Sequence, residues 1–150
     1  MIVTVTLNPS IDRTAPIAGP LRRGQVNRLG SSTEVAAGKG VNISRVLRGA
    51  GIETCAVVPA GAKGRLTLGL NHDDIPHQVV PVAAAVRTNL TITEPDGTTT
   101  KINEPGADLS PEELTAIEEA IVEQSSGAQW VVLSGSLPPG VPTHWYGGGR

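Results

Sequence analysis

Residues that could bind an anion occur together in the segment Gly38-Lys39-Gly40-Val41-Asn42, directly before a stretch with helical periodicity. A glycine loop that opens a helix presents backbone N–H groups to an anion, and Lys39 adds a full positive charge. The segment is not a Walker loop, and it lacks the third glycine of a dinucleotide-binding fingerprint. Taken alone it is weak evidence, because a glycine turn that only lets the helix pack is about equally common.

Three further segments carry polar side chains suited to a phosphorylated sugar. Asp12, in the segment Asn8-Pro9-Ser10-Ile11-Asp12, can accept hydrogen bonds from sugar hydroxyls, because an ionised carboxylate is acceptor-only. Arg87 can bind a phosphate through its bidentate guanidinium. Ser134-Gly135-Ser136 offers two hydroxyls directly after an apolar run. It does not match the Gly-x-Ser-x-Gly turn of esterases, so we expect no nucleophilic serine.

Each of these side chains also has a simpler interpretation when it is considered alone. Asp12 could be a solvated turn residue, and Arg87 could be an exposed residue at the edge of a sheet. Their positions favour the binding interpretation, since ligands of open parallel sheets bind beyond the carboxyl ends of the strands. The segments of Asp12, Gly38 and Ser134 each follow a predicted strand or precede a predicted helix. We therefore expect them to converge on one pocket.

The elements that must position these residues alternate along the chain. Apolar runs at residues 1–7, 54–58 and 130–133 predict buried strands. Residues 41–47 show helical spacing, and Ser110-Pro111-Glu112-Glu113 is a capping box that begins a second helix. The order strand, helix, strand, helix, strand predicts an α/β layered domain.

Two hairpin-like stretches interrupt this alternation. Residues 14–18 and 25–35 are expected to pair with each other across a glycine- and proline-containing turn region. Residues 86–93 and 98–103 flank Asp96-Gly97, which is a strong hairpin signal. Both stretches predict a small β extension beside the α/β domain.

The composition restricts the classes of function. A formal net charge of −2 gives no electrostatic reason to expect nucleic acid or an anionic membrane as a partner. The single cysteine, Cys55, excludes an internal disulfide, and with three scattered histidines it forms no zinc pattern. The N-terminus does not match a signal peptide, and no apolar run reaches membrane-spanning length. We therefore expect a cytoplasmic protein without a metal site of its own.

Five segments, taken in order, resemble the N-terminal half of the 1-phosphofructokinases, a group in the PfkB branch of the ribokinase-like sugar kinases. They are Asn8 to Asp12, Gly38 to Asn42, Arg87 to Asn89, Gly97 to Gly106 and Ser134 to Gly140. The resemblance implies a three-layer α/β sandwich with a small β lid, built from residues of about 13–35 and 87–103. It also implies phosphorylation of fructose 1-phosphate to fructose 1,6-bisphosphate with ATP and Mg²⁺, and a possible homodimer that pairs through the lid.

The resemblance further implies a set of substrate-binding residues. These are Asp12, Gly38, Lys39, Asn42, Arg87, Lys101, Asn103, Ser134, Gly135 and Ser136. Asp12 would hold sugar hydroxyls, and Arg87 would bind the phosphate of the substrate from the lid. The glycine loop and the serine segment would complete the pocket, whereas Lys101 and Asn103 are assigned only through the motif that contains them. Ala37 stands where the family more often has glycine, so a positive φ is not expected there.

Two segments that the resemblance leads us to look for do not occur in these 150 residues. One is an Asn-x-x-Glu segment that organises magnesium and phosphate, and the other is a Gly-Ala-Gly-Asp segment that supplies the general base and the anion hole. We therefore expect residues 1–150 to be a partial kinase domain, truncated to its N-terminal half, with no catalytic residue and without the ATP-binding half. Residues 143–146 resemble the start of a helix, but the glycines at 147–149 oppose its continuation, since each costs about 1 kcal/mol in a helix interior.

Three interpretations of function remain open from the sequence. The chain could be a phosphosugar kinase by ancestry that is inactive alone or needs a complementary fragment. A tagatose-6-phosphate kinase is an alternative within the same branch, because these residues do not discriminate the two ketoses. The third interpretation is a non-catalytic module that binds a phosphosugar or dimerises through the lid.

Overall fold

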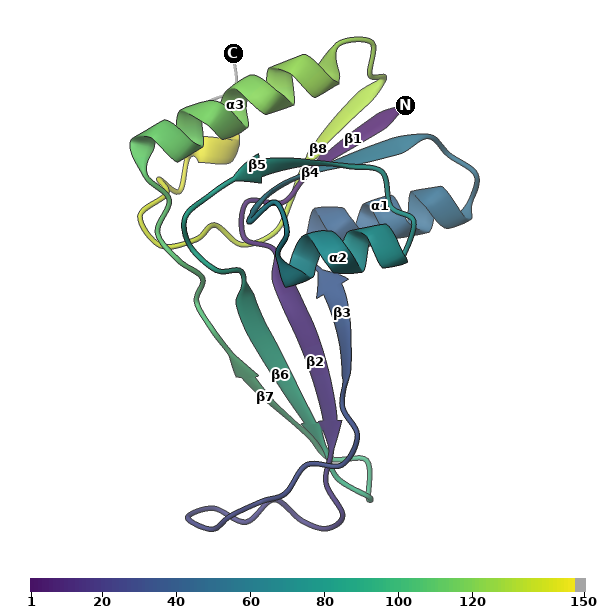
Figure 1. Ribbon diagram of the computed structural model, residues 1–150, viewed down its shortest axis with the longest axis vertical. Coiled ribbons are helices and arrows are strands. Elements are labelled where there is room, and N and C mark those ends of the chain that lie inside the picture. The colour runs from purple at the N-terminus through teal and green to yellow at the C-terminus, as the bar shows by residue number, and fades with distance from the viewer. Residues whose placement is uncertain (148–150) are drawn as a thin grey trace.

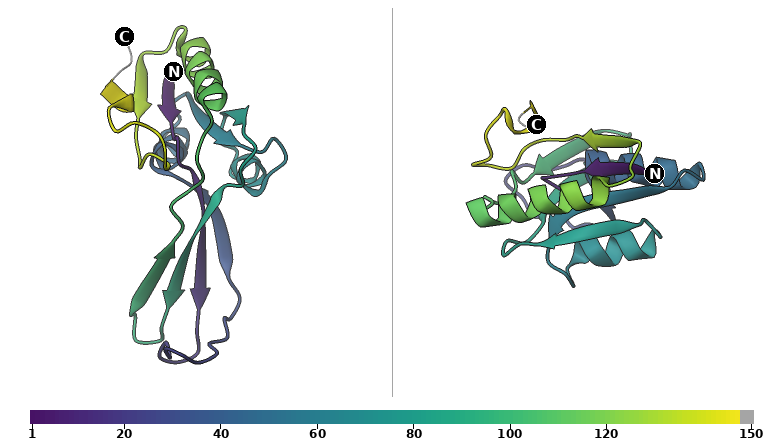
Figure 2. Two further views of the ribbon diagram at one scale, coloured as in Figure 1. Left: turned by 90° about the vertical axis from the view of Figure 1, so that its left-hand side faces the viewer. Right: turned by 90° about the horizontal axis from the view of Figure 1, so that it is seen from above.

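The computed structural model describes residues 1–147, which form two four-stranded sheets arranged end to end (Figure 1). One sheet is entirely parallel, with the strand order β5-β4-β1-β8. The other, here called the lid sheet, is mixed, has the order β3-β2-β6-β7 and extends away from the helices (Figure 2). The strands are β1 (Ile2–Val5), β2 (Ser10–Pro16), β3 (Thr33–Ala37), β4 (Thr54–Ala60), β5 (His77–Pro81), β6 (Arg87–Thr93), β7 (Thr99–Asn103) and β8 (Trp130–Leu133). The helices are α1 (Lys39–Gly49), α2 (Arg65–His72), α3 (Pro111–Ser125) and a short 3-10 turn, η1 (Trp145–Gly147).

Helices cover both faces of the parallel sheet. Successive residues of a strand point to opposite faces, so alternate positions of β4 enter two separate apolar clusters. One cluster joins the sheet to α1 and α2 and comprises Ile11, Ala36, Val41, Ala56, Val58, Ala60, Leu66, Leu70 and Ile75. The other lies beneath α3 and comprises Val3, Val5, Leu7, Val57, Val80, Ile117 and Val141. The predicted α/β layering is therefore confirmed, with α1 and α2 in one layer, the sheet in the middle and α3 in the third.

A chain of buried hydroxyl groups fixes α1 against the parallel sheet. Ser44 of α1 bonds to Thr4 of β1 and to Thr54 of β4, with oxygen–oxygen distances of 2.8 and 2.9 Å. Thr54 also donates to the carbonyl of Ile2 at 2.9 Å. Buried polar groups cost free energy unless they are paired, so these bonds favour a single position for the helix and for the loop before it.

The lid sheet places polar residues of two strands side by side. β2 and β6 are parallel, and their register pairs Ser10 with Arg87 and Asp12 with Asn89. β3 adds to β2, and β7 to β6, in antiparallel pairs. The second of these pairs is the hairpin predicted around Asp96-Gly97, which is confirmed.

The predicted start of the first lid hairpin was wrong. Pairing was expected from residue 14, but β2 begins at Ser10 and pairs with β3 from Ala37 backwards. Asp12 is therefore an exposed residue inside a strand and not a turn residue. The physical reason is the alternation of this segment, in which Ile11 is buried in the cluster beneath α1 and α2 while Asp12 points away from it.

The sequence interpretation missed α2 and β5. The eight residues of α2 include Gly69, which reads as a helix breaker but has a packing role. A Cβ atom at Gly69 would lie 2.8 Å from the Cβ of Ala36, so glycine is what allows α2 to lie against β3. β5 is an edge strand of five residues that ends at Pro81, and short edge strands give little periodicity to detect.

The predicted capping box at the start of α3 is confirmed. Ser110 Oγ accepts a hydrogen bond from the Glu113 N–H at 3.1 Å, and the Glu113 carboxylate accepts one from the Ser110 N–H at 2.8 Å. The same carboxylate also accepts from the N–H of Ala83 at 2.8 Å. Ala83 lies between β5 and β6, so Glu113 ties α3 to a segment that leads into the lid sheet.

The last described residues pack back onto the molecule. Trp145 in η1 donates from its indole nitrogen to Glu118 of α3 at 3.0 Å. The glycines at 148 and 149, which we expected to oppose a helix, lie outside the described residues. At the sheet edge formed by β8, Trp130 is 69% exposed. No helix within residues 1–147 combines the length and the apolar character needed to cross a membrane.

Candidate functional site

A cleft of about 420 Å³ lies where the parallel sheet meets the lid sheet. Four segments of the chain form its walls: the β1–β2 junction, the start of α1, the start of β6 and the segment after β8. The lining residues are Thr6, Asn8, Ser10, Asp12, Gly38, Lys39, Asn42, Arg87, Asn89, Gly135 and Ser136. The structure thus brings together seven of the ten site residues expected from the sequence, all except Lys101, Asn103 and Ser134.

Asp12 presents one carboxylate oxygen to the cleft. Its Oδ1 accepts hydrogen bonds from Ser10 Oγ at 2.8 Å and from Asn89 Nδ2 at 3.2 Å. Within the described residues no hydrogen bond reaches the second oxygen, Oδ2. The carboxylate is therefore held by two neighbours on the lid sheet, and it keeps an acceptor free for a ligand hydroxyl.

Arg87, the first residue of β6, lines the cleft. In the part of the chain that the structure describes, it forms no ion pair with a carboxylate. Its guanidinium donates to the backbone carbonyls of Glu104 at 3.1 Å and Asn8 at 3.2 Å, and more weakly to Ser136 Oγ at 3.4 Å. Its Nε is buried and has no partner among these residues. A guanidinium whose charge is not neutralised nearby attracts an anion such as phosphate.

The glycine loop lets β1 approach the start of α1 closely. Gly38 has a φ of 136°, whereas Ala37 has no positive φ, as its residue type predicted. A Cβ atom at Gly40 would lie 2.5 Å from Thr6 Oγ1 and 2.9 Å from the carbonyl oxygen of Val5. Both glycines are therefore required by the backbone and by packing, in addition to any contact with a ligand.

The first turn of α1, which begins at the cleft, leaves two backbone donors without a partner among the described residues. Thr6 Oγ1 accepts from the N–H of Val41 at 3.1 Å, but no described residue bonds to the N–H groups of Lys39 and Gly40. The first N–H groups of a helix have no partner inside the helix, and together with the helix dipole they favour an anion. Lys39 adds a charge at the same place, so the cleft carries two cationic side chains, Lys39 and Arg87, against one carboxylate.

The wall after β8 is fixed from both sides. Ser136 Oγ accepts from Asn8 Nδ2 at 3.2 Å, and Asn8 also donates to the Pro105 carbonyl at 2.9 Å. On the other side, the Tyr146 hydroxyl donates to the carbonyl of Gly135 at 3.0 Å. Partial burial raises the pKa of Tyr146, which keeps this hydroxyl protonated and able to donate. The Gly135 backbone, with a φ of 105°, is thereby held against Lys39.

Three expected site residues do not line the cleft. Lys101 and Asn103 are exposed residues of β7, opposite Thr91 and Asn89 respectively. Asn103 is therefore one strand farther from the cleft than Asn89, its partner on β6. Ser134 lies directly after β8, where its Oγ is buried and has no hydrogen-bond partner among the described residues.

Four lining residues were not among those expected to bind, namely Thr6, Asn8, Ser10 and Asn89. The signal for two of them was the period of a strand, since residues two apart share one face. Ser10 shares a face with Asp12, and Asn89 shares a face with Arg87. Residues 86–93 were predicted as a strand, so the second pair could have been recognised from the sequence. The segment of Ser10 and Asp12 was not predicted as a strand, so the first pair could not.

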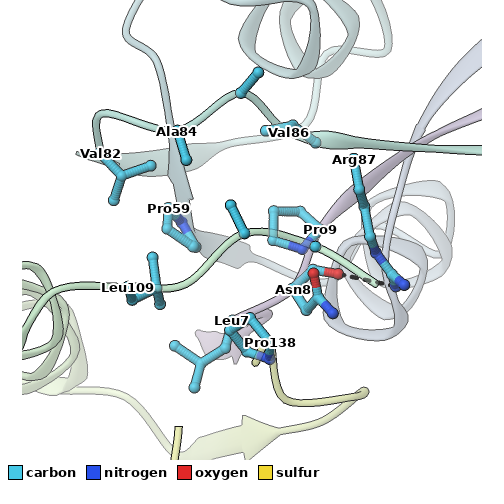
Figure 3. A pocket seen from close by; sticks show the side chains of 13 residues that line it. Leu7, Asn8, Pro9, Pro59, Val82, Ala84, Val86, Arg87, Leu109 and Pro138 are labelled. Atoms are coloured by element: carbon cyan, nitrogen blue, oxygen red, sulfur yellow. Dashed lines mark hydrogen bonds between the residues drawn. The ribbon is translucent and has the colours of Figure 1, made fainter. Parts of the chain in front are cut away.

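A second pocket, beside the cleft, is too small and apolar to hold a sugar. Figure 3 shows it between Leu7, Pro59, Val82, Leu109 and Pro138, with the bond from Arg87 to Asn8 at its edge. Its volume of about 30 Å³ leaves room for only about two or three water molecules. We interpret it as a gap in the packing where the parallel sheet joins the lid sheet.

Comparison with known proteins identifies the family. The sequence model of the pfkB family carbohydrate kinases matches residues 5–147. The chain belongs to the pfkB carbohydrate kinase family. This confirms the broader part of the resemblance found in the sequence.

Curated relatives of this pfkB-family chain include two kinds of phosphofructokinase. A 1-phosphofructokinase of Vibrio cholerae is 32% identical over 145 residues, which cover 93% of this chain and 44% of that protein. The ATP-dependent 6-phosphofructokinase isozyme 2 of Mycobacterium tuberculosis is 33% identical over 150 residues, covering 97% and 43%. The chain thus spans less than half the length of these relatives. Their similar identities do not select one kind over the other.

Solved pfkB-related structures confirm the ribokinase-like α/β fold. The phosphofructokinase-2 of Escherichia coli, solved in complex with fructose-6-phosphate, superposes with a TM-score of 0.85 at 32% identity. That match covers 94% of this chain and 47% of the other. A possible 1-phosphofructokinase from Thermotoga maritima gives a TM-score of 0.81 at 31% identity, with 95% and 47% covered. The predicted fold, including its parallel sheet and β lid, is confirmed over about half of the full-length fold.

The described residues contain no cluster of side chains that forms a dedicated metal site. Among them no group of three or more His, Cys, Asp or Glu side chains lies close enough to hold a metal. In the cleft only Asp12 supplies a carboxylate, and one of its oxygens is already bonded twice. Mg²⁺ is usually held by one or two carboxylates together with waters and substrate phosphates, and of these ligands the cleft itself offers a single carboxylate.

Proposed function

We propose that this chain contributes the phosphosugar-binding half of an ATP-dependent kinase that acts on a fructose phosphate. One observation carries the proposal: Arg87 and Asp12 line the same cleft. Among the described residues, Arg87 has no carboxylate partner, and one carboxylate oxygen of Asp12 accepts no hydrogen bond. A phosphorylated ketose has both groups that such a cleft recognises, an anionic phosphate and several hydroxyls.

The proposed contacts follow from the charge and hydrogen-bonding capacity of each residue. Arg87 binds the phosphate of the sugar, and Asp12 accepts hydrogen bonds from its hydroxyls. Lys39 and the free N–H groups of α1 lie at the other wall, where they stabilise negative charge on the ligand. Ser136 and Asn42 supply neutral polar contacts. For Lys101, Asn103 and Ser134 the motif match remains the only support.

We propose fructose 1-phosphate as the acceptor, which the reaction converts to fructose 1,6-bisphosphate. Fructose 6-phosphate is a second candidate, because relatives named as 6-phosphofructokinases match as well as those named as 1-phosphofructokinases. The Escherichia coli relative was also solved with that sugar. Tagatose 6-phosphate, the alternative from the sequence, differs from fructose 6-phosphate only in hydroxyl configuration, so the same cleft is able to admit it.

We propose that transfer of the phosphoryl group from ATP needs residues outside this half of the fold. The 150 residues contain neither the Asn-x-x-Glu nor the Gly-Ala-Gly-Asp segment that the family resemblance assigns to magnesium, general base and anion hole. Phosphoryl transfer depends on positioning and charge neutralisation, which those groups supply. We therefore propose that the 150-residue polypeptide binds the sugar phosphate, and that turnover with ATP requires the complementary half.

We also propose that the lid sheet pairs with a second copy. Its outer strands β3 and β7 each have one open edge among the described residues, and such edges are available for pairing. The phosphofructokinase-2 of Escherichia coli, a relative, has been solved in a tetrameric inhibited form. A module that only binds a sugar phosphate or dimerises is the non-catalytic alternative.

The test combines binding with turnover. Calorimetric titration of the 150-residue protein with fructose 1-phosphate, fructose 6-phosphate and tagatose 6-phosphate measures affinity and selectivity. ADP formation is then assayed with ATP and Mg²⁺, alone and with the C-terminal half of a pfkB-family relative. Binding with turnover only on complementation supports the proposal. Binding without any turnover favours the module, and absence of binding to all three sugars overturns the proposal.

A further inference from the structure

Arg45 joins three parts of the molecule next to the cleft. It lies on α1, one turn after Asn42, and its side chain is 32% exposed. Its Nη2 donates to the carbonyl of Ala36 at 2.6 Å and to the Asp73 carboxylate at 2.8 Å. Its Nη1 donates to Oδ1 of Asn42 at 2.8 Å. The Arg45 guanidinium thus bonds to the end of β3, to the residue after α2 and to Asn42.

The bond to Asn42 decides which end of the amide faces the cleft. A guanidinium has only donors, so the group that Asn42 turns toward Arg45 must be its carbonyl oxygen. This assignment does not depend on distinguishing oxygen from nitrogen in the side chain. The amide nitrogen, with two donors, is left on the other side. Asn42 lines the cleft, and its amide nitrogen is the polar side-chain group that Arg45 leaves free.

We propose that Arg45 is a positioning residue, which holds the Asn42 amide with its NH2 group directed into the cleft. The proposal deepens the proposed function and rests on it for the identity of the ligand. With Arg45 in place, Asn42 donates to lone pairs of a sugar hydroxyl, while Asp12 accepts from hydroxyl protons. A hydroxylated ligand satisfies both residues, because each hydroxyl donates one hydrogen bond and accepts others.

Arg45 differs from the neighbouring arginine of α1, which provides a contrast. Arg48 also pairs with an aspartate, Asp74, but it donates to no residue of the cleft. Both ion pairs link α1 to the end of α2, and loss of either removes one such link. Only Arg45 adds a bond to a residue that lines the cleft, so only its loss releases the Asn42 amide.

The experiment is a double-mutant cycle between Arg45 and Asn42, measured as the dissociation constant for fructose 1-phosphate or fructose 6-phosphate in 0.15 M salt. We expect Arg45→Met to weaken binding about tenfold, the loss typical of one misdirected hydrogen bond. In the Asn42→Ala background the same change is expected to have little effect, because the group that it positions is absent. An Arg45→Met effect of equal size in both backgrounds would overturn the proposal, since it would reflect lost charge or a general structural role.

Asp73→Ala is the matched structural control. Asp73→Ala removes the ion pair, while Arg45 keeps its bonds to Ala36 and Asn42. We expect the free energy of unfolding to fall and the affinity for the sugar phosphate to stay within about twofold of the wild type. Arg48→Met controls for the loss of a positive charge on the same helix, with the same expectation for affinity. If either control weakens binding as much as Arg45→Met does, the proposal is overturned.

A ligand-free measurement separates this proposal from the proposed function. The side-chain ¹⁵N–H2 resonances of Asn42, assigned by their loss in Asn42→Ala, report the order of the amide. We expect an ordered amide in the wild type and in Arg48→Met, and a disordered one in Arg45→Met. An amide that stays ordered in Arg45→Met overturns the role of Arg45. Failure of the wild type to bind any of the three sugar phosphates overturns the proposed function, and the amide signal still decides the role of Arg45.

Discussion

Asn89 and Asp12, on adjacent parallel strands of the lid sheet, are joined by a hydrogen bond of 3.2 Å from Nδ2 to Oδ1. Ser10 donates to the same oxygen from two residues earlier in β2. The two donors occupy Oδ1 and leave Oδ2 as the atom that Asp12 offers to the cleft. The register of β2 and β6 thus sets the polarity of one wall of the site before any ligand binds.

Replacement of Asp12 by Asn should reverse that polarity. The amide oxygen takes the place of Oδ1, because Ser10 and Asn89 donate to it, and the amide nitrogen then replaces the free acceptor. We expect the affinity for a fructose phosphate to fall about 10- to 100-fold, since hydrogen bonds to a charged group contribute about 1.5–3 kcal/mol. Isothermal titration measures this. Asp96→Asn, at the remote tip of the lid hairpin, is the control, and an equal loss in both variants would contradict the role of Asp12.

Arg87 should not tolerate replacement by Lys. Lysine keeps the charge, but its single ammonium cannot reproduce the planar fork that reaches the carbonyls of Glu104 and Asn8. We expect affinity for the sugar phosphate to fall about tenfold in Arg87→Lys and further in Arg87→Met. Titrations at several salt concentrations should show that the affinity of Arg87→Met for the sugar phosphate depends less on salt than that of the wild type. Arg28→Lys, at the exposed end of the lid, should bind as the wild type does, and normal affinity of Arg87→Met would exclude a phosphate at this position.

Two glycines of α1 should respond oppositely to replacement by alanine. At Gly40 the new Cβ would lie 2.5 Å from Thr6 Oγ1 and 2.9 Å from the backbone oxygen of Val5, which cannot move without distorting β1. We expect Gly40→Ala to lower the free energy of unfolding by about 1–3 kcal/mol. At Gly49 nothing lies within 4 Å, so Gly49→Ala should stabilise the helix by about 0.5–1 kcal/mol. Urea denaturation of both variants provides the measurement, and similar effects would show that packing against β1 is unimportant.

The sequence predicted the main elements of the fold because their signals are local. The capping box at Ser110 and the hairpin at Asp96-Gly97 need only a few neighbouring residues to be recognised, and both are confirmed. The helix α2 was missed because Gly69 owes its presence to contact with Ala36, more than thirty residues away in the chain. No local pattern contains that information.

The candidate site was predicted in part for the same reason. Lys39 and Arg87 could be named from their own segments, and the structure brings them into one cleft. The contribution of Asn89 depends on the register between β2 and β6, which is a tertiary property. Asn103 was expected in the site through its motif. However, β6 lies between β7 and β2, so Asn89 and not Asn103 is the residue next to Asp12.

Glu113 should make stability depend on pH in the acid range. Backbone N–H groups of Ser110 and, to a lesser extent, Ala83 donate to its carboxylate and hold its pKa below the ordinary value of 4.5. A carboxyl group whose pKa is lower in the folded state stabilises the fold above the unfolded pKa, and this stabilisation is lost as the pH falls through the folded pKa. We therefore expect the free energy of unfolding to fall between pH 5 and the folded pKa, and to fall less in Glu113→Gln. Glu119→Gln, in the middle of α3, should keep the wild-type profile. Identical pH profiles for the wild type and Glu113→Gln would show that the bonds to Ser110 and Ala83 do not stabilise the ionised form, and the link from α3 to the lid would then need another explanation.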